Sequence, residues 1–280
     1  MIFITGPRQG IRNGATQASI GRMTPQSLPP ALTAALAHAW AEHRPIAVAA
    51  WKVADEAEAY AVHDGLIAAL GWQPAGQPQY WKSGGGSRQA LLTHAPLATA
   101  GVRSGSGLDF SDLQLHAPGV EAEIALRTGR DLRAADLDGL TIDNAAAIVI
   151  DAMAVSIELI GSRWQEAFDA PALLRLADCQ SHGGLALGDW LPYRADHDWG
   201  KQACTLTVNG SPAQMGSGAH PLGDPAWGLL SWLQHATRDG RTLPAGSVVT
   251  TGAWRVQLGL KPGDRAVARF DGLGAVEVGL

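Results

Sequence analysis

An alternation of apolar and acidic residues at positions 120–126 constrains this chain more than any other feature. The segment reads VEAEIAL, and its apolar positions alternate with Glu121, Glu123 and Ala125. A period of two is typical of a β-strand, so both glutamates share one face, with about 6.5–7 Å between their backbones. A divalent cation is the simplest group that neutralises two such carboxylates. The alternative interpretation is the solvated face of an edge strand.

A second segment, SIELIGSR at residues 156–163, adds a third carboxylate. Glu158 lies among Ile157, Leu159 and Ile160, which indicates a second strand. These apolar neighbours argue against a solvent-exposed position for the glutamate. Carboxylate oxygens are the ligands that hard cations prefer. Together the two segments predict a Mg²⁺ or Mn²⁺ site in which three acidic ligands converge from strands.

The composition excludes several classes of protein. Of the 280 residues, 46% are hydrophobic and 17% are charged, which predicts a globular core and not a disordered chain. The net charge is −5 and no basic cluster occurs, so nucleic acid is not an expected partner. The longest apolar run, at 145–150, is too short to span a membrane, and no signal-peptide pattern is seen. We therefore expect a cytoplasmic protein with two free thiols.

The N-terminal quarter predicts helices after an irregular start. Residues 1–28 are expected to be extended or poorly ordered, and Pro29 opens an Ala-rich helical segment. Asp55 is the expected N-cap of a helix over 56–70, which Gly71 ends. We predict an N-terminal extension and helical lobe over residues 1–75 and a catalytic core over 76–280.

The remainder predicts an α+β core that is mostly β. Residues 72–118 are expected to form a long loop region with short strands. Asn209 and Gly210 predict a hairpin after a strand that begins near residue 203, and GSVVTTG at 246–252 and GDRAVARFDGLGAVEVGL at 263–280 predict further strands. Short helices are expected from Thr141 to Ile150, over ALLRLAD at 172–178, and from an Asp224 cap to Gly240.

Eight motifs, taken together and in order, resemble a known family over roughly residues 52–280. They are AYAVHDGL, WKSGGGS, VEAEIALRTGRDL, SIELIGSRW, ADCQSHGGLALG, AHPLGDPAWGLLSWL, AGSVVTTGAW and GDRAVARFDGLGAVEV. The chain resembles the 2-hydroxypenta-2,4-dienoate hydratase and 4-oxalocrotonate decarboxylase branch of the fumarylacetoacetate hydrolase superfamily. The resemblance implies a rolled, mixed β-sandwich core with peripheral helices and a small helical N-terminal lobe. It also implies a homo-oligomer and a small 2-oxo or 2-enol acid as substrate.

The resemblance also assigns roles to individual residues. Glu121, Glu123 and Glu158 match the ligands of a Mg²⁺ or Mn²⁺ ion. Lys82 matches an active-site lysine, and Ser181 matches one serine of a catalytic pair. The expected substrate-binding positions are Gly84, Ser87 and Gly183.

This chain departs from the family pattern around the expected substrate. Gly161 stands where the family usually has Asp, and Cys179-Gln180 replaces Asn-Ala. The second serine of the pair is His182, which is expected to be either a proton donor or a structural turn residue. Residues 96–99 read Pro-Leu-Ala-Thr in place of Pro-Asp-Phe-Gly. None of these changes falls on an expected metal ligand, so they bear on the choice of substrate.

Several activities suit such a site. A metal-bound 2-oxo acid can form an enolate, and Lys82 is expected to orient the substrate or transfer a proton. Hydration of a 2-hydroxy-2,4-dienoate in aromatic catabolism is the first expectation, and decarboxylation of a 4-oxalocrotonate-type acid is the second. A carbon–carbon bond hydrolase is the third, with His94 and His116 as possible partners of a glutamate. A family member that binds a ligand without turnover is the alternative from another class.

Overall fold

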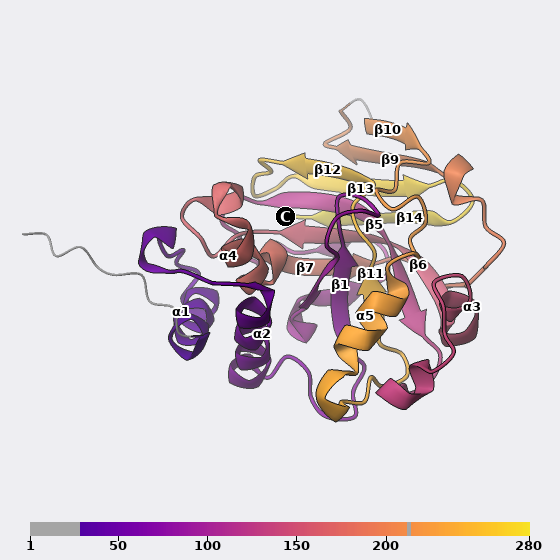
Figure 1. Ribbon diagram of the computed structural model, residues 1–280. Coiled ribbons are helices and arrows are strands. Elements are labelled where there is room, and N and C mark those ends of the chain that lie inside the picture. Colours follow the sequence, from indigo (N-terminus) through magenta and orange to yellow (C-terminus); the bar gives the residue numbers. More distant parts are fainter. Residues whose placement is uncertain (1–28, 212–213) are drawn as a thin grey trace, which may run out of the picture.

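Two β-sheets and five α-helices make up the part of the chain that the computed structural model describes, residues 29–211 and 214–280 (Figure 1). The helices are α1 (Pro29–Glu42), α2 (Glu56–Leu70), α3 (Ala145–Val149), α4 (Ala172–Ala177) and α5 (Leu229–Ala236). Residues 1–28, for which an extended start was expected, lie outside the described part.

The larger sheet has nine strands among the described residues. They are β1 (Tyr80–Gly84), β2 (Thr93–Pro96), β3 (Val102–Ser104), β5 (Gly119–Thr128), β6 (Ile150–Ile160), β7 (His182–Leu187), β8 (Leu191–Pro192), β11 (Val248–Thr250) and β12 (Arg255–Leu258). Their order is β2-β1-β11-β5-β6-β7-β3, with β12 also paired to β5 and β8 to β6. β1 is parallel to β11 and β3 is parallel to β7, whereas β5 and β6 are antiparallel, so the sheet is mixed.

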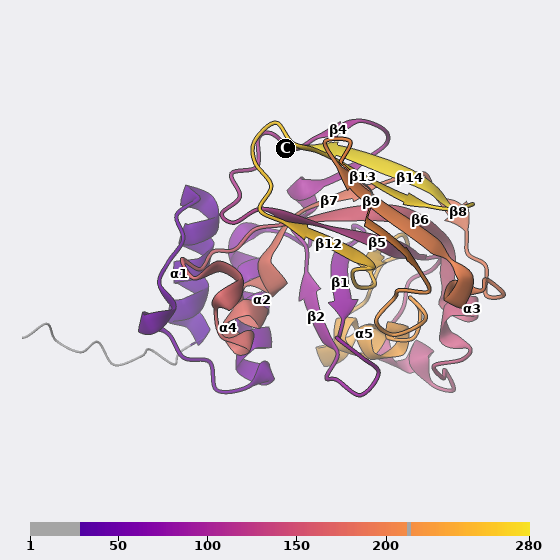
Figure 2. The ribbon, with the colours of Figure 1, turned by 90° about the horizontal axis from the view of Figure 1, so that it is seen from above.

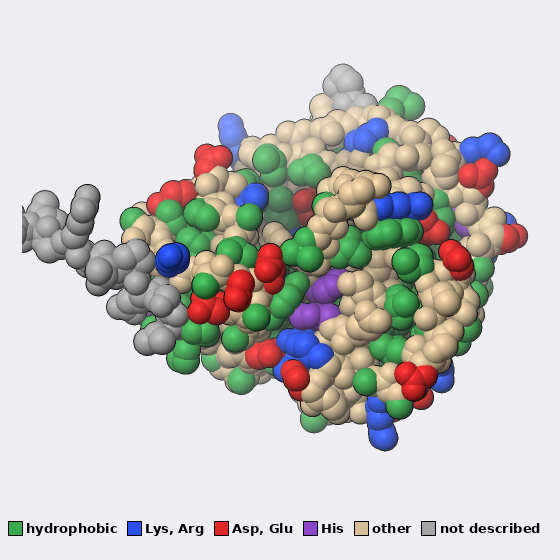
Figure 3. All heavy atoms as spheres, in the orientation of Figure 1, with side chains coloured by type: hydrophobic (Ala, Val, Ile, Leu, Met, Phe, Trp, Pro, Cys, Tyr) green, Lys and Arg blue, Asp and Glu red, His purple; other side chains and the backbone are tan. Residues whose placement is uncertain are grey.

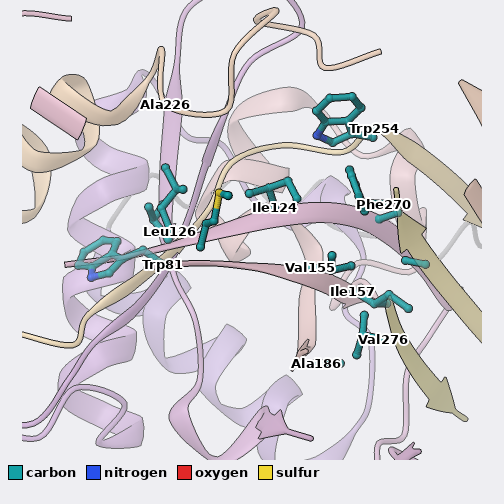
Figure 4. Close-up of a cluster of buried hydrophobic side chains, with 14 of the residues drawn as sticks. Trp81, Ile124, Leu126, Val155, Ile157, Ala186, Ala226, Trp254, Phe270 and Val276 are labelled. Carbon is teal, nitrogen blue, oxygen red and sulfur yellow. The ribbon is translucent and has the colours of Figure 1, made fainter. Parts of the chain in front are cut away.

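The smaller sheet packs across one face of the larger one. Its strands are β4 (Leu108–Asp109), β9 (Ala203–Val208), β10 (Gln214–Ser217), β13 (Arg265–Phe270) and β14 (Gly274–Gly279), in the order β10-β9-β13-β14-β4. The side chains of Ile124 and Ile157 on the larger sheet meet Phe270 and Val276 on the smaller one (Figure 4). This apolar layer fixes which face of β5 and β6 is turned away from the second sheet.

A second apolar core lies in the helical lobe, to one side of the sheets (Figure 2). Leu36 of α1, Val62 and Leu66 of α2, and Leu174 of α4 are all buried in it. Because α4 follows β6 in the chain, the lobe draws residues from both sides of position 75. The division at 75/76 therefore remains a prediction. Within the described ranges, no helix combines the length and the apolar character that crossing a membrane requires.

The ends of α2 are those expected from the sequence. The Asp55 carboxylate accepts a hydrogen bond from the Glu58 backbone N–H at 3.0 Å, and Gly71 ends the helix with φ 66°. Such a carboxylate satisfies one of the free N–H groups of the first turn. The hairpin after β9 is also confirmed, since Asn209 and Gly210 have φ 53° and 67°.

Two helix boundaries differ from expectation. Thr141 does not cap α3; its N–H donates to the Asn144 side chain at 2.7 Å, and Ile150 already pairs with Thr128 as the first residue of β6. The helix expected from Asp224 to Gly240 is only α5, because residues 224–228 form tight turns and Gly228 precedes the first helical residue. Glycine disfavours a helix interior, which accounts for the late start.

Candidate active site

Four charged side chains project from one face of the larger sheet. The β5–β6 register places Glu121 directly opposite Glu158, with Glu123 two residues along the same strand. Lys82 of β1 pairs with Thr250 of β11, which in turn pairs with Ala125 of β5. Residues that pair directly, and residues two apart on a strand, share a face. The register alone therefore brings Lys82 and the three glutamates together on the face that the second sheet does not cover.

The three carboxylates are close enough to hold one cation. One oxygen from each of Glu121, Glu123 and Glu158 lies within 4.8 Å of the others. Glu123 is 1% exposed and Glu158 is 0% exposed, and β5 lies between β11 and β6 within the sheet, so the edge-strand interpretation is wrong. A second oxygen of Glu158 is buried without a hydrogen-bond partner among the described residues. An all-oxygen set with an unsatisfied buried oxygen fits a hard divalent cation.

Lys82 supplies positive charge to this cluster. Its Nζ lies 2.8 Å from Glu158 Oε1 and 3.7 Å from Glu121 Oε2, and it also donates to the backbone oxygen of Gln180 at 3.3 Å. The lysine and glutamate side chains are enclosed, with 14% of Lys82 and none of Glu158 exposed. The ammonium thus neutralises part of the charge that three adjacent carboxylates carry.

The pKa values follow from burial and mutual charge. Burial raises the pKa of Glu123, and the nearby Glu158 and Glu121 raise it further, to about 8. Burial also raises the pKa of Glu121. Burial opposes the charged forms of Glu158 and Lys82 as well, but their attraction outweighs it, so the pKa of Glu158 is lowered and that of Lys82 is raised. The single Lys82 ammonium therefore does not balance the negative charge that the three glutamates would carry together.

His182 contacts a glutamate of this cluster directly. Its Nδ1–H donates to Glu158 Oε1 at 3.2 Å, and the imidazole is fully buried. Burial lowers the pKa of His182, so the ring is neutral at ordinary pH. A neutral imidazole that donates to a carboxylate oxygen fixes the rotamer of that carboxylate. The sequence offered His182 as a proton donor or a turn residue and did not identify this contact.

The charged residues open into a cavity of about 330 Å³. Lys82, Glu121 and Glu123 line it, and residues from β1, β2, α4 and the loop around 252 complete its wall. The other lining residues include Gly84, Thr93, Ile160, Phe168, Arg175, Gln180, Ser181 and Pro221. The molecular surface is hollowed between the helical lobe and the sheets, where an acidic side chain is visible (Figure 3). The cavity is large enough for a small organic acid beside the carboxylates.

Ser181 reaches the cavity through an unusual turn. Cys179, Gln180 and Ser181 have φ values of 49°, 52° and 61°, the left-handed region that non-glycine residues rarely adopt. Consecutive residues of this kind are retained where the surrounding structure over-determines them, often at functional sites. The turn aims the Gln180 carbonyl at Lys82 and leaves the Ser181 side chain at the cavity wall.

The expected substrate-binding positions are not all in the same place. Gly84 lines the cavity, whereas Ser87 and Gly183 are not among its lining residues. The Ser87 hydroxyl accepts a hydrogen bond from the Gln89 N–H at 3.3 Å. A Cβ on Gly183 would lie 2.9 Å from the Leu159 oxygen, so this glycine permits close packing behind β6. Roles for Ser87 and Gly183 in substrate binding remain predictions.

The departures from the family pattern have structural counterparts. A Cβ on Gly161 would lie 2.9 Å from the Leu115 Cβ, so Leu115 fills the space that a longer side chain needs. Close by, Arg163 forms a buried ion pair with Asp178 at 2.5 Å and donates to the His182 oxygen. This pair anchors the chain on both sides of the left-handed turn.

Neither histidine considered for a hydrolase reaches the cavity wall. His94 bonds to the hydroxyls of Ser83 and Ser231 at 2.9 and 3.1 Å, and His116 Nε2 lies 3.3 Å from the Gln165 oxygen. Neither ring is among the cavity-lining residues. The geometry therefore gives no support to His94 or His116 as the water-activating partner of a glutamate.

Comparison with protein families gives one match over most of the chain. Residues 92–280 match the model described as fumarylacetoacetate (FAA) hydrolase C-terminal. This range contains the three glutamates, His182 and Ser181, and it begins ten residues after Lys82.

Curated relatives carry hydratase and decarboxylase names. A 4-oxalocrotonate decarboxylase from Pseudomonas sp. is 28% identical over 62% of this chain and 64% of its own length. A 2-keto-4-pentenoate hydratase from Paraburkholderia xenovorans is 31% identical over 58% of each chain. The alignments thus span less than two thirds of these relatives. A 2-keto-4-pentenoate hydratase 1 from Dechloromonas aromatica is 30% identical over 80% of this chain and 85% of its own length.

Solved structures share the fold. The 4-oxalocrotonate decarboxylase from Pseudomonas putida G7, complexed with magnesium and adipate, superposes with a TM-score of 0.74 at 23% identity, covering 90% of this chain and 96% of that one. A fumarylpyruvate hydrolase from Pseudomonas aeruginosa, complexed with Mn²⁺ and pyruvate, gives 0.52 at 17% identity over 72% and 89%. The predicted α+β fold, with a rolled β-sandwich and peripheral helices, is confirmed.

Proposed function

Because the chain belongs to the fumarylacetoacetate hydrolase family, we propose that it is a divalent-metal-dependent hydratase. It adds water to a 2-hydroxy-2,4-dienoate and releases a 4-hydroxy-2-oxo acid, in the catabolism of aromatic compounds. The observation that carries the proposal is the cluster of Glu121, Glu123, Glu158 and Lys82, three of which line one cavity while Glu158 contacts Lys82. Mg²⁺ or Mn²⁺ is the proposed ion, held by the three glutamates. The proposed assembly is a homo-oligomer, and its proposed location is the cytoplasm.

The reaction has two parts. For the five-carbon dienol, the 2-hydroxyl loses its proton and C5 gains one, which gives a 2-oxo-3-enoate. Water then adds its hydroxyl at C4 and its proton at C3. A bound divalent ion would supply Lewis acidity to the carboxylate and 2-oxo oxygens of the substrate, and so stabilise the enolate form.

The chain's own residues bind the substrate and move protons. Lys82 is held as an ammonium by Glu158, so it donates hydrogen bonds to a substrate oxygen; it can give its proton to C5 and then take up the proton that the 2-hydroxyl releases. The Ser181 side chain lies at the cavity wall, where its hydroxyl can donate to the same ligand. His182 keeps Glu158 in place and does not line the cavity.

Decarboxylation of a 4-oxalocrotonate-type acid is the second candidate. It needs the same stabilised enolate, with carbon dioxide leaving in place of water adding. The names of two of the relatives above favour it, since both are 4-oxalocrotonate decarboxylases.

Turnover with and without metal tests the proposal. Chelator-treated protein would receive freshly generated 2-hydroxypenta-2,4-dienoate with Mg²⁺, with Mn²⁺, or with neither. We expect the dienol absorbance to fall only with metal and a 4-hydroxy-2-oxo acid to accumulate. Metal-dependent release of carbon dioxide from 4-oxalocrotonate, without hydration of either compound, would establish the second candidate. Metal binding with no product from any dienol or oxo acid would point to a ligand-binding protein.

A further inference from the structure

An arginine without a partner lies in the wall of the cavity. Arg175 belongs to α4 and lines the same cavity as Lys82 and the glutamates. Its Nε is buried and has no hydrogen-bond partner among residues 29–211 and 214–280, and its guanidinium makes no ion pair with them. Arg163, by contrast, is neutralised by Asp178. Arg163 therefore has its counter-charge within the protein, whereas Arg175 has none among the described residues.

A guanidinium in this position calls for an anion. Arg175 is half-buried, and its buried Nε without a partner leaves one donor of a charged group unsatisfied, which is costly. Arginine offers a planar set of N–H donors that matches a carboxylate in a bidentate arrangement. Arg175 makes no ion pair with any of the three glutamates, although all line or adjoin one cavity. The guanidinium is therefore free to pair with an anion from outside the described residues, and the cavity is where a substrate enters.

We propose that Arg175 binds a second carboxylate of the substrate, so that the substrate is a 2-hydroxy-dienoate with an acid group at each end. This inference rests on the proposed function, which places the 2-oxo acid end at the glutamates. Ile160 and Phe168 give the same cavity apolar wall, which suits an unsaturated carbon chain between two acid groups. A substrate with one carboxylate leaves the Arg175 charge unpaired.

The position of this charge also separates the two candidate reactions. Decarboxylation of a 4-oxalocrotonate-type acid converts the distal carboxylate into neutral carbon dioxide. An ion pair with Arg175 stabilises the carboxylate and is lost as the carbon–carbon bond breaks, so it opposes that reaction. Addition of water leaves both carboxylates in place and retains the ion pair. Arg175 therefore selects a dicarboxylate that is hydrated with its distal carboxylate kept.

Binding of two matched inert acids tests the inference without turnover. 2-Oxohexanedioate and 2-oxohexanoate share the chelating end and differ in the distal carboxylate. Calorimetry on the Mg²⁺-loaded protein should show the diacid binding roughly 10- to 100-fold more tightly, as expected for a charged hydrogen-bonded pair. Arg175→Met should abolish this ratio, and Arg175→Lys should restore part of it. Arg130→Met, at an exposed position, should leave it unchanged.

Equal affinities for the two acids in the unaltered protein would overturn the inference, as would a preference for the diacid that survives Arg175→Met. Failure of both acids to bind would overturn it as well. The proposed function is tested separately, by metal-dependent loss of a dienol. Hydration of the five-carbon monoacid with no diacid preference would keep the function and remove the role of Arg175. A diacid preference without turnover of any dienol would keep Arg175 as a ligand-binding residue and remove the hydratase.

Discussion

Lys82 partly neutralises the three glutamates when no metal ion is bound. Its ammonium contacts Glu158 at 2.8 Å and Glu121 at 3.7 Å, so it shares carboxylates with the proposed metal. Two cations near the same oxygens repel each other. The lysine must therefore weaken the affinity of the site for a metal while it serves the substrate.

Lys82→Met should raise metal affinity and abolish turnover. Loss of the ammonium leaves three carboxylates for the ion alone, so we expect the dissociation constant for Mg²⁺ to fall by roughly 10-fold, about 1.4 kcal/mol. Calorimetry gives the affinity, and dienol absorbance gives the activity. Lys52→Met, which removes an exposed lysine, should change neither. Weaker Mg²⁺ binding in Lys82→Met would contradict the competition.

Glu158→Gln should remove most of the stabilisation that a divalent metal gives. Glu158 is the fully buried member of the three glutamates and is held by both Lys82 and His182. A ligand that binds only the folded state raises the melting temperature, so Mg²⁺ should raise that of the unaltered protein and have little effect on the variant. Glu277→Gln, at an exposed ion pair with Arg265, is the control. A full Mg²⁺ response in Glu158→Gln would exclude it as a ligand.

At this scale the sequence predicted the grouping of the three glutamates better than their surroundings. The period of two placed Glu121 and Glu123 on one face, and the register then put Glu158 opposite Glu121. Register depends on pairing across the sheet and cannot be read from one strand. The partners of His182 and the isolation of Arg175 arise from segments far apart in the chain, so no local pattern indicated them.

Three elements, α2, β2 and α5, meet around a cluster of histidines. His63 of α2, His94 of β2 and His235 of α5 lie together with Tyr60, and the His94 and His235 ring centroids are 5.1 Å apart. Burial, with help from Arg238, lowers the pKa of His63 and of His94 to about 4.

The cluster should make folding sensitive to mild acid. A histidine with pKa about 4 when folded and about 6.5 when unfolded binds its proton mainly in the unfolded state between these values. Stability is thus complete above pH 6.5 and falls as the pH drops toward 4, by about 2 kcal/mol at pH 5 for each such group. Urea unfolding gives the free energy of unfolding at pH 7.5 and at pH 5.0. The loss of this free energy between the two pH values should be smaller by about 2 kcal/mol in His63→Gln than in the unaltered protein.

The matched control for this prediction is His38→Gln, at an exposed position on α1. This variant should lose the same free energy of unfolding between pH 7.5 and pH 5.0 as the unaltered protein. If His63→Gln and the unaltered protein lose the same free energy of unfolding between the two pH values, His63 does not contribute to acid sensitivity.

The elements themselves were predicted unevenly. The caps of α2 are local hydrogen bonds, so Asp55 and Gly71 marked both ends correctly. The start of α5 depends on turns after Asp224, whose carboxylate accepts from the Ala226 N–H at 2.7 Å, and a capping residue alone does not distinguish such turns from a helix. β12 was missed because its partner, residues 119–122 on β5, lies more than 130 residues away.

The described part of the molecule has two large apolar cores and a smaller cluster around Leu97, Leu185 and Val248, and the cavity depends on both large cores. The core between the sheets positions β5 and β6, which carry the glutamates. The core of the helical lobe positions α4, which carries Arg175 and leads into the turn at Ser181. Damage to one core should therefore affect one wall of the cavity before the other.

Hydrogen exchange in two matched leucine variants tests this division. Leu36→Ala in α1 and Leu206→Ala in β9 each remove a fully buried side chain, and each should cost about 2–5 kcal/mol. Because α1 packs on α2, and α2 packs on α4 in the same apolar core, Leu36→Ala should speed exchange over 172–182 and leave β13 and β14 protected. Leu206→Ala should speed exchange in β9 and β13 and leave α4 protected. Equal acceleration throughout the chain in both variants would mean that the helical lobe and the sheets unfold as one unit, and that the lobe gives α4 no separate support.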